Sequence, residues 1–161
     1  MSIIVSDEQR EELFEFAPRL RHKPFEPTSR RTPPERPIYN CAAYALGIYK
    51  GEWWPLPAYK WFDGLPRDDS LASFVTAFEQ RGYARCSDSS LEHGYQKVAI
   101  LTNADGPQHL AVQQANGRWR SKFGLLEDLE CELEDLTGDK YGTPTVFLKR
   151  RIPGSGAASE R

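Results

Sequence analysis

The sequence predicts an α+β domain in which N-terminal helices pack on a small antiparallel sheet. Apolar residues recur at helical spacing between Asp69 and Gly82, with Asp69 or Ser70 as the helix cap. Segments typical of strands follow, and Asn116-Gly117 between two of them is a strong signal for a two-residue hairpin turn. An antiparallel sheet therefore follows the helices.

The chain of 161 residues is long enough for one packed domain, and its sequence divides into three parts. In residues 1–37, Ser6 with Gln9 forms a capping box that predicts a helix from Ser6 to about Phe16, and a basic, proline-rich wrap follows it. Residues 38–152 form the main predicted domain. Residues 153–161 are expected to be a disordered tail.

Within the main domain, Asn40 is a favoured cap for a helix from Cys41 to about Lys50, which Gly51 ends. The spacing of Leu126, Leu129, Leu133 and Leu136 predicts a further helix. Strands are predicted at Gln96–Thr102, Gln108–Gln114, Arg118–Gly124 and Thr143–Arg150.

Seven carboxylates and no Lys or Arg lie from Glu127 to Asp139. The first interpretation is a solvated helix face, and the second is a site for a basic protein partner.

Composition narrows the classes of function. The net charge is −2 and no stretch approaches the roughly 18 apolar residues of a membrane span, so neither a membrane nor a nucleic-acid partner is expected. The N-terminus lacks the features of a secretory signal, so we expect a cytoplasmic protein, with non-classical secretion as an effector left open. The three cysteines form no CxxC pair and have no nearby histidine cluster, so neither a metal nor another cofactor is expected.

Cys41 and His109 are the candidate catalytic residues. A thiol at the start of a helix meets backbone N–H groups that have no partner inside the helix, and these lower its pKa from about 8.5 toward roughly 3.5 to 7.5. A histidine on a later strand can hold the pair as thiolate and imidazolium and then protonate the leaving group. Taken alone, Cys41 would more often be a buried structural residue.

Four segments carry a family resemblance: "NCAAYALG", "WWP", "KVAILTNADGPQHLAVQQANGRWRSKFG" and "YGTPTVFLKR". They resemble an uncharacterised bacterial domain family with NCxAxAxG, HxAxQ and GxWxSKxG motifs, which is similar to the papain-like cysteine hydrolase superfamily of NlpC and CHAP type. The resemblance covers most of residues 40–150. It implies a papain-like fold, a Cys41 nucleophile, a His109 base, and a peptidase or amidase acting on a protein or peptide substrate.

The residue that would orient His109 is not evident. With a two-residue turn at Asn116-Gly117, Lys122 shares the face of His109 and Ser121 takes the other, whereas a one-residue bulge would bring Ser121 to the site. Lys122 could also bind an acidic substrate group or lower the thiol pKa. Asn40 is first a helix cap and second a contributor to the oxyanion site.

Other interpretations remain open. Trp53, Trp54 and Trp61 belong to the core or line a substrate groove. The whole domain could be a catalytically inactive papain-like fold that acts as a protein-binding or immunity module. Delivery to another cell as a toxin or effector is a further alternative.

Overall fold

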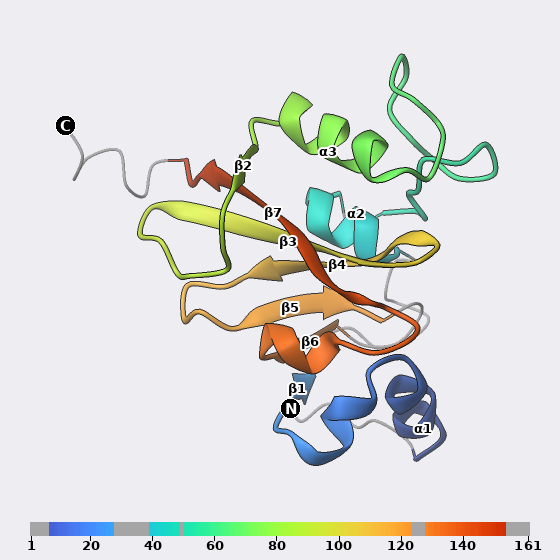
Figure 1. Ribbon diagram of the computed structural model, residues 1–161, viewed down its shortest axis with the longest axis vertical. Helices are drawn as coiled ribbons and strands as arrows, with labels where there is room; N and C mark the ends of the chain where they lie inside the picture. The colour runs from blue at the N-terminus through green and yellow to red at the C-terminus, as the bar shows by residue number, and fades with distance from the viewer. Residues whose placement is uncertain (1–6, 28–38, 49, 124–127, 154–161) are drawn as a thin grey trace.

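A seven-stranded antiparallel sheet, ordered β1-β6-β5-β4-β3-β7-β2, runs through the centre of the protein (Figure 1). The computed structural model describes residues 7–27, 39–48, 50–123 and 128–153. Its strands are β1 (Glu26–Pro27), β2 (Ala84–Cys86), β3 (Tyr95–Asn103), β4 (Gly106–Gln113), β5 (Trp119–Lys122), β6 (Asp128–Cys131) and β7 (Thr143–Arg151). Its helices are α1 (Asp7–Phe16), α2 (Cys41–Leu46) and α3 (Leu71–Gln80), with 3-10 turns η1 (Pro18–His22) and η2 (Leu133–Leu136).

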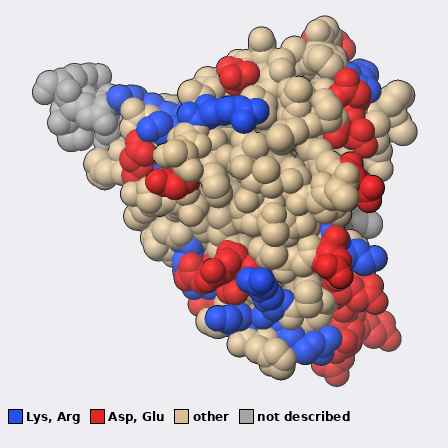
Figure 2. All heavy atoms as spheres, in the orientation of Figure 1, with Lys and Arg blue, Asp and Glu red and all other residues tan. Residues whose placement is uncertain are grey.

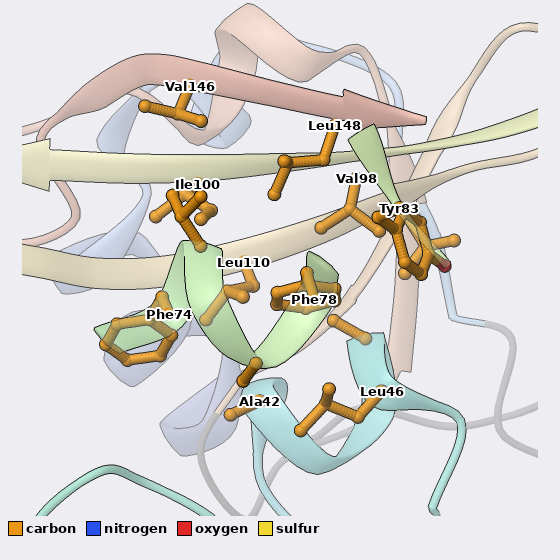
Figure 3. Packing of buried hydrophobic residues seen from close by; sticks show 14 of the residues in the cluster. Ala42, Leu46, Phe74, Phe78, Tyr83, Val98, Ile100, Leu110, Val146 and Leu148 are labelled. Carbon is orange, nitrogen blue, oxygen red and sulfur yellow. The ribbon is translucent and has the colours of Figure 1, made fainter. Parts of the chain in front are cut away.

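Helices α2 and α3 cover one face of the sheet (Figure 1). The side chains of both helices point toward the strands and meet residues such as Ile100 and Leu110 (Figure 3). These contacts form the first core cluster. Its members from the helices and central strands are Cys41, Ala42, Ala45, Leu46, Phe74, Val75, Ala77, Phe78, Val98, Ile100, Leu110, Val112, Val146 and Leu148.

A second core cluster lies on the opposite face. Leu13 of α1, Leu20 of η1 and Leu136 of η2 pack there against the sheet. Strand residues of the two clusters alternate along β3. Val98 and Ile100 belong to the first cluster, and Ala99 and Leu101 belong to the second. The central strands are therefore buried on both faces, because side chains alternate along a strand.

The predicted α+β class and antiparallel sheet are confirmed, as are the helix at 69–82 and the four predicted strands. Ser70 caps α3, since its Oγ accepts a hydrogen bond from the Ser73 N–H at 3.3 Å. The N-terminal helix is also present from Asp7, while Ser6 lies outside the described residues, as do the proline-rich segment 28–38 and the tail from 154. No helix among the described residues has the length and apolar character needed to cross a membrane.

Two predicted helices differ from the structure. The helix at Cys41 ends at Leu46, because Gly47 takes a left-handed conformation with φ 74° and its N–H bonds back to the carbonyls of Ala43 and Tyr44. Most of the predicted acidic helix is instead β6 followed by η2. Leu129 and Cys131 face the second core, so the leucine spacing that predicted a helix comes from a strand followed by a 3-10 turn.

The β4–β5 hairpin also differs from the prediction. The Gln114 N–H donates to the Arg118 carbonyl at 2.8 Å, and Gly117 has φ 86°, which is a three-residue loop with a left-handed glycine. Val112 consequently pairs with Arg120, a register shifted by one residue. Ser121, not Lys122, therefore lies on the face of His109. The placement expected for a two-residue turn was wrong, and the alternative, in which one extra residue brings Ser121 to this face, is the one found.

The tight turn before β7 generates a stability prediction. Gly142 has φ 79°, and a Cβ atom there would overlap the Thr102 backbone carbonyl, whereas Gly47 has a similar φ with no atom within 4 Å of a Cβ. We expect Gly142→Ala to lower the free energy of unfolding by about 3 kcal/mol or more, and Gly47→Ala by only about 1 kcal/mol. Urea denaturation of both variants measures this, and equal losses would contradict the packing at Gly142.

Candidate functional site

Asn40 fixes the start of α2 and with it the position of Cys41. Its side-chain Oδ1 accepts hydrogen bonds from the N–H of Ala43 at 3.0 Å and of Trp53 at 3.1 Å. Its Nδ2 donates to the Trp53 carbonyl at 2.8 Å. The amide therefore caps the helix and also ties it to the loop that follows, which contains Trp53, Trp54 and Trp61 and is called the aromatic loop below.

The Cys41 thiol is buried against β4, and only 8% of the residue is exposed. Backbone N–H groups of Leu110, Ala42 and Cys41 itself lie close enough to favour the thiolate, but burial outweighs them and raises the thiol pKa to about 11. We expected a lowered pKa from the helix start. Helix α2 has only six residues, and the thiol at its start is enclosed by the first core.

The Leu110 N–H reaches the thiol where β4 and β5 diverge. The β-ladder between these strands contains only the pairs Val112–Arg120 and Gln113–Trp119, so it ends before Leu110. Helix α2 contacts both strands. Cys41 thus lies beside the residue that directly follows His109.

His109 projects toward the second core, where aromatic rings enclose it. Its ring stacks on Tyr141 with centroids 3.8 Å apart and an interplanar angle of 7°, and it contacts Phe123 at 5.3 Å. Only 1% of the residue is exposed, and this burial lowers the imidazole pKa to about 3. Its Nε2 has no hydrogen-bond partner among the described residues.

Cys41 and His109 therefore approach the divergence of β4 and β5 from opposite faces of the sheet. No hydrogen bond joins them within the part of the chain that the structure describes. Tyr141 lies near both, since burial and then the charge of Cys41 raise the pKa of its hydroxyl well above its usual value. At neutral pH the thiol and the imidazole are both uncharged in this arrangement.

The predicted site-lining residues Ser121 and Lys122 separate onto the two faces. Ser121 is buried on the His109 side, and its Oγ has no hydrogen-bond partner among the described residues. Lys122 lies on the α2 side, with its Nζ 5.0 Å from the ring centroid of Tyr39. The backbone N–H groups that favour the Cys41 thiolate come from Leu110, Ala42 and Cys41 itself.

A buried polar cluster surrounds Lys122. Tyr39 donates a hydrogen bond to Asp128 Oδ2 at 2.7 Å, and Asp128 lies directly across from Lys122 on β6. Sequence reasoning missed Tyr39 and Asp128, although the alternation of carboxylates with Leu129 and Cys131 was a readable strand signal. Nothing in the sequence around Tyr141 signalled a contact with His109.

The aromatic loop packs on the domain. Trp61 is buried and contacts the Phe74 ring at 5.7 Å, while Trp54 contacts the same ring at 4.8 Å. Trp53 contacts Phe62 at 5.1 Å and donates its indole N–H to the Lys50 carbonyl. Through these contacts the aromatic loop extends the first core cluster beside α3.

Two clefts lie away from Cys41 and His109. One, of about 390 Å³, has Trp119, Glu132 and Phe147 among its lining residues, and the other, of about 380 Å³, lies between the start of α3 and the β3–β4 turn. Among the described residues, no group of His, Cys, Asp and Glu side chains could hold a metal ion.

The burial of His109 predicts a pH-dependent stability. Its pKa is about 3 in the folded protein and 6.5 ordinarily, so the unfolded chain binds more protons between these values and stability falls as pH drops below 6.5. From pH 6.5 to 5, we expect wild type to lose up to about 1.4 kcal/mol per pH unit more than His109→Gln. Exposed His93 supplies the control, because His93→Gln should follow wild type in urea denaturation across this range. Equal slopes for all three proteins would contradict a buried, neutral His109.

Comparison with known proteins identifies the family of the chain. A family model described as a domain of unknown function, DUF7689, matches residues 30–149. No curated protein and no solved structure matches the chain. An uncharacterised domain family was expected from the motifs between residues 40 and 150, and the match confirms that part of the expectation. Through residues 30–149, the chain belongs to the DUF7689 family of domains of unknown function.

Proposed function

We propose that the protein is a papain-like cysteine hydrolase or acyltransferase that acts on an amide or related acyl bond. Cys41 is the nucleophile and His109 transfers the proton. The proposal rests on the resemblance of the NCxAxAxG and HxAxQ motifs and on the order of a cysteine-bearing helix before an antiparallel sheet.

One observation carries the proposal: the Cys41 sulfur lies beside the backbone N–H of Leu110, the residue after His109. Cys41 and His109, 68 residues apart in the sequence, thereby lie at neighbouring positions along β4, with their side chains on opposite faces of the sheet. The three N–H groups that favour the thiolate, from Cys41, Ala42 and Leu110, could also donate to the oxyanion that forms on a carbonyl oxygen when this sulfur attacks.

The proposed reaction begins with transfer of the thiol proton to the imidazole, and the sulfur then attacks the carbonyl carbon. As the C–N bond breaks, the imidazolium returns its proton to the departing amine, and a thioester remains on Cys41. Water, or an amine in acyl transfer, attacks the thioester while the imidazole removes its proton. The thiol is regenerated when the acyl group leaves.

The resting pair must open before it reacts. Burial is the largest cause of both pKa shifts, upward for Cys41 and downward for His109. Exposure to solvent or to a polar substrate therefore moves both pKa values toward those of a reactive pair. A substrate that displaces the side chains packed over Cys41 and over His109 would activate the thiol and the imidazole together.

The substrate is proposed to be a protein or peptide, and no cofactor takes part in the proposed chemistry. A basic protein partner at residues 127–139 remains a proposal. Glu132, Glu134 and Asp139 are exposed there, while Glu130 is buried in an ion pair with Arg120 at 2.8 Å. Action in the cytoplasm, or after delivery as an effector, belongs to the same proposal.

The competing proposal is a noncatalytic papain-like module that binds a protein. The enclosure of His109 by Phe123 and Tyr141 favours it, because a buried neutral imidazole is also an ordinary structural residue. The two proposals differ in the reactivity of Cys41.

Alkylation by iodoacetamide at about pH 6 tests the proposed function, with all three cysteines followed by mass spectrometry. Cys86 is partly exposed and provides an internal reference thiol, while Cys131 is buried with a pKa raised to about 12. Because Cys41 is buried at rest, its rate reports how often the pair opens. We expect His109→Ala to slow Cys41 at least about tenfold with no change at Cys86. A Cys41 rate independent of His109 would favour the binding module.

A further inference from the structure

We propose that Tyr141 is the positioning residue of His109 and fills the role that a carboxylate or amide would otherwise have. The inference rests on the proposed function, because it concerns how the His109 ring is held for proton transfer. It starts from an absence within the described residues: no side chain forms a hydrogen bond with the His109 ring. Ser121 shares its face of the sheet, yet the Ser121 Oγ is unpartnered as well.

Stacking provides the orientation that hydrogen bonding does not. The Tyr141 ring lies 3.8 Å from the His109 ring and within 7° of parallel, while Phe123 contacts the imidazole at a tilt of 41°. The face of a tyrosine ring carries negative potential and attracts a cation placed over it. Tyr141 can therefore both fix the plane of the imidazole and stabilise the imidazolium that forms when Cys41 loses its proton.

Tyr141 is itself held by a short turn. Gly138 and Gly142 exchange two backbone hydrogen bonds, at 2.7 and 3.1 Å, which close the chain around residues 139–141. Gly142 packs directly on the backbone of Thr102. The turn is thereby fixed to the end of β3, so the Tyr141 ring has a defined place on the sheet.

Helix α1 supports the same ring from behind. Phe16 stacks on Tyr141 with centroids 5.4 Å apart and an interplanar angle of 30°. A Cβ on Gly138 would lie 2.9 Å from Pro18 Cδ, so the turn and the end of α1 are in close contact. Residues 7–16 precede the segment that the family model matches, and they reach the site through this stack of three rings.

The rate of Cys41 alkylation by iodoacetamide at about pH 6 tests the inference in the full-length protein. We expect Tyr141→Leu to slow Cys41 at about pH 6 by about tenfold, because the imidazolium loses its ring partner. Tyr141→Phe keeps the ring without the hydroxyl and should restore most of that rate. Tyr83→Leu removes a tyrosine of similar burial that packs on Phe78 and should leave the Cys41 rate unchanged. The Cys86 rate should stay constant throughout.

The outcomes separate this inference from the proposed function. If His109→Ala does not slow Cys41 in the wild-type background, the proposed function fails and this inference fails with it. If His109→Ala slows Cys41 but Tyr141→Leu reacts as fast as Tyr141→Phe, only the role of Tyr141 is overturned. Should Tyr141→Leu not fold, Phe16→Leu removes only the supporting ring. An expected fall of about threefold then supports the inference, and an unchanged rate overturns it.

Discussion

Strand β4 is buried on both faces, and the rest of the structure depends on this constraint. Side chains alternate along the strand, so Leu110 enters the core beneath α2 and α3 while His109 enters the core beneath α1 and η2. The β-ladder to β5 ends at Val112, which leaves the Leu110 N–H facing Cys41. Cys41 and His109 thus meet the same stretch of β4 from its two faces, and both are enclosed there.

Burial and polarity are distributed unequally around this strand. On the α2 side of β5 and β6, polar side chains are paired: Arg120 of β5 with Glu130 of β6, and Tyr39, just before α2, with Asp128 of β6. On the other side, His109 and Ser121 lie among apolar and aromatic groups. At the surface, acidic residues gather over α1, beside lysines and arginines at the same end of the molecule (Figure 2). An unpartnered buried polar atom costs free energy, and such atoms are more readily retained where a site needs them.

The sequence was sufficient for α3 and the long strands because their periodicity is strong and their caps are clear. It was not sufficient for β6, where the leucine spacing of a strand followed by a 3-10 turn matches that of a helix. Asn116-Gly117 predicted a hairpin correctly, but the loop has three residues, and one residue of register exchanges Ser121 with Lys122 at the face of His109. The order of Cys41 and His109 along the chain was enough to predict them as a candidate pair. The contact of Tyr141 with His109 became visible only through tertiary packing, which spacing along the chain does not encode.

The central claim is that Cys41 and His109 form a reacting pair once the side chains that bury them move aside. A crystal structure of the protein after reaction with a peptide chloromethyl ketone tests this most directly, since the reagent forms a thioether with a reactive cysteine. The account predicts the adduct on Cys41 with a His109 ring nitrogen within about 4 Å of its sulfur. An adduct confined to Cys86, or a His109 ring more than about 8 Å from an alkylated Cys41, would contradict it.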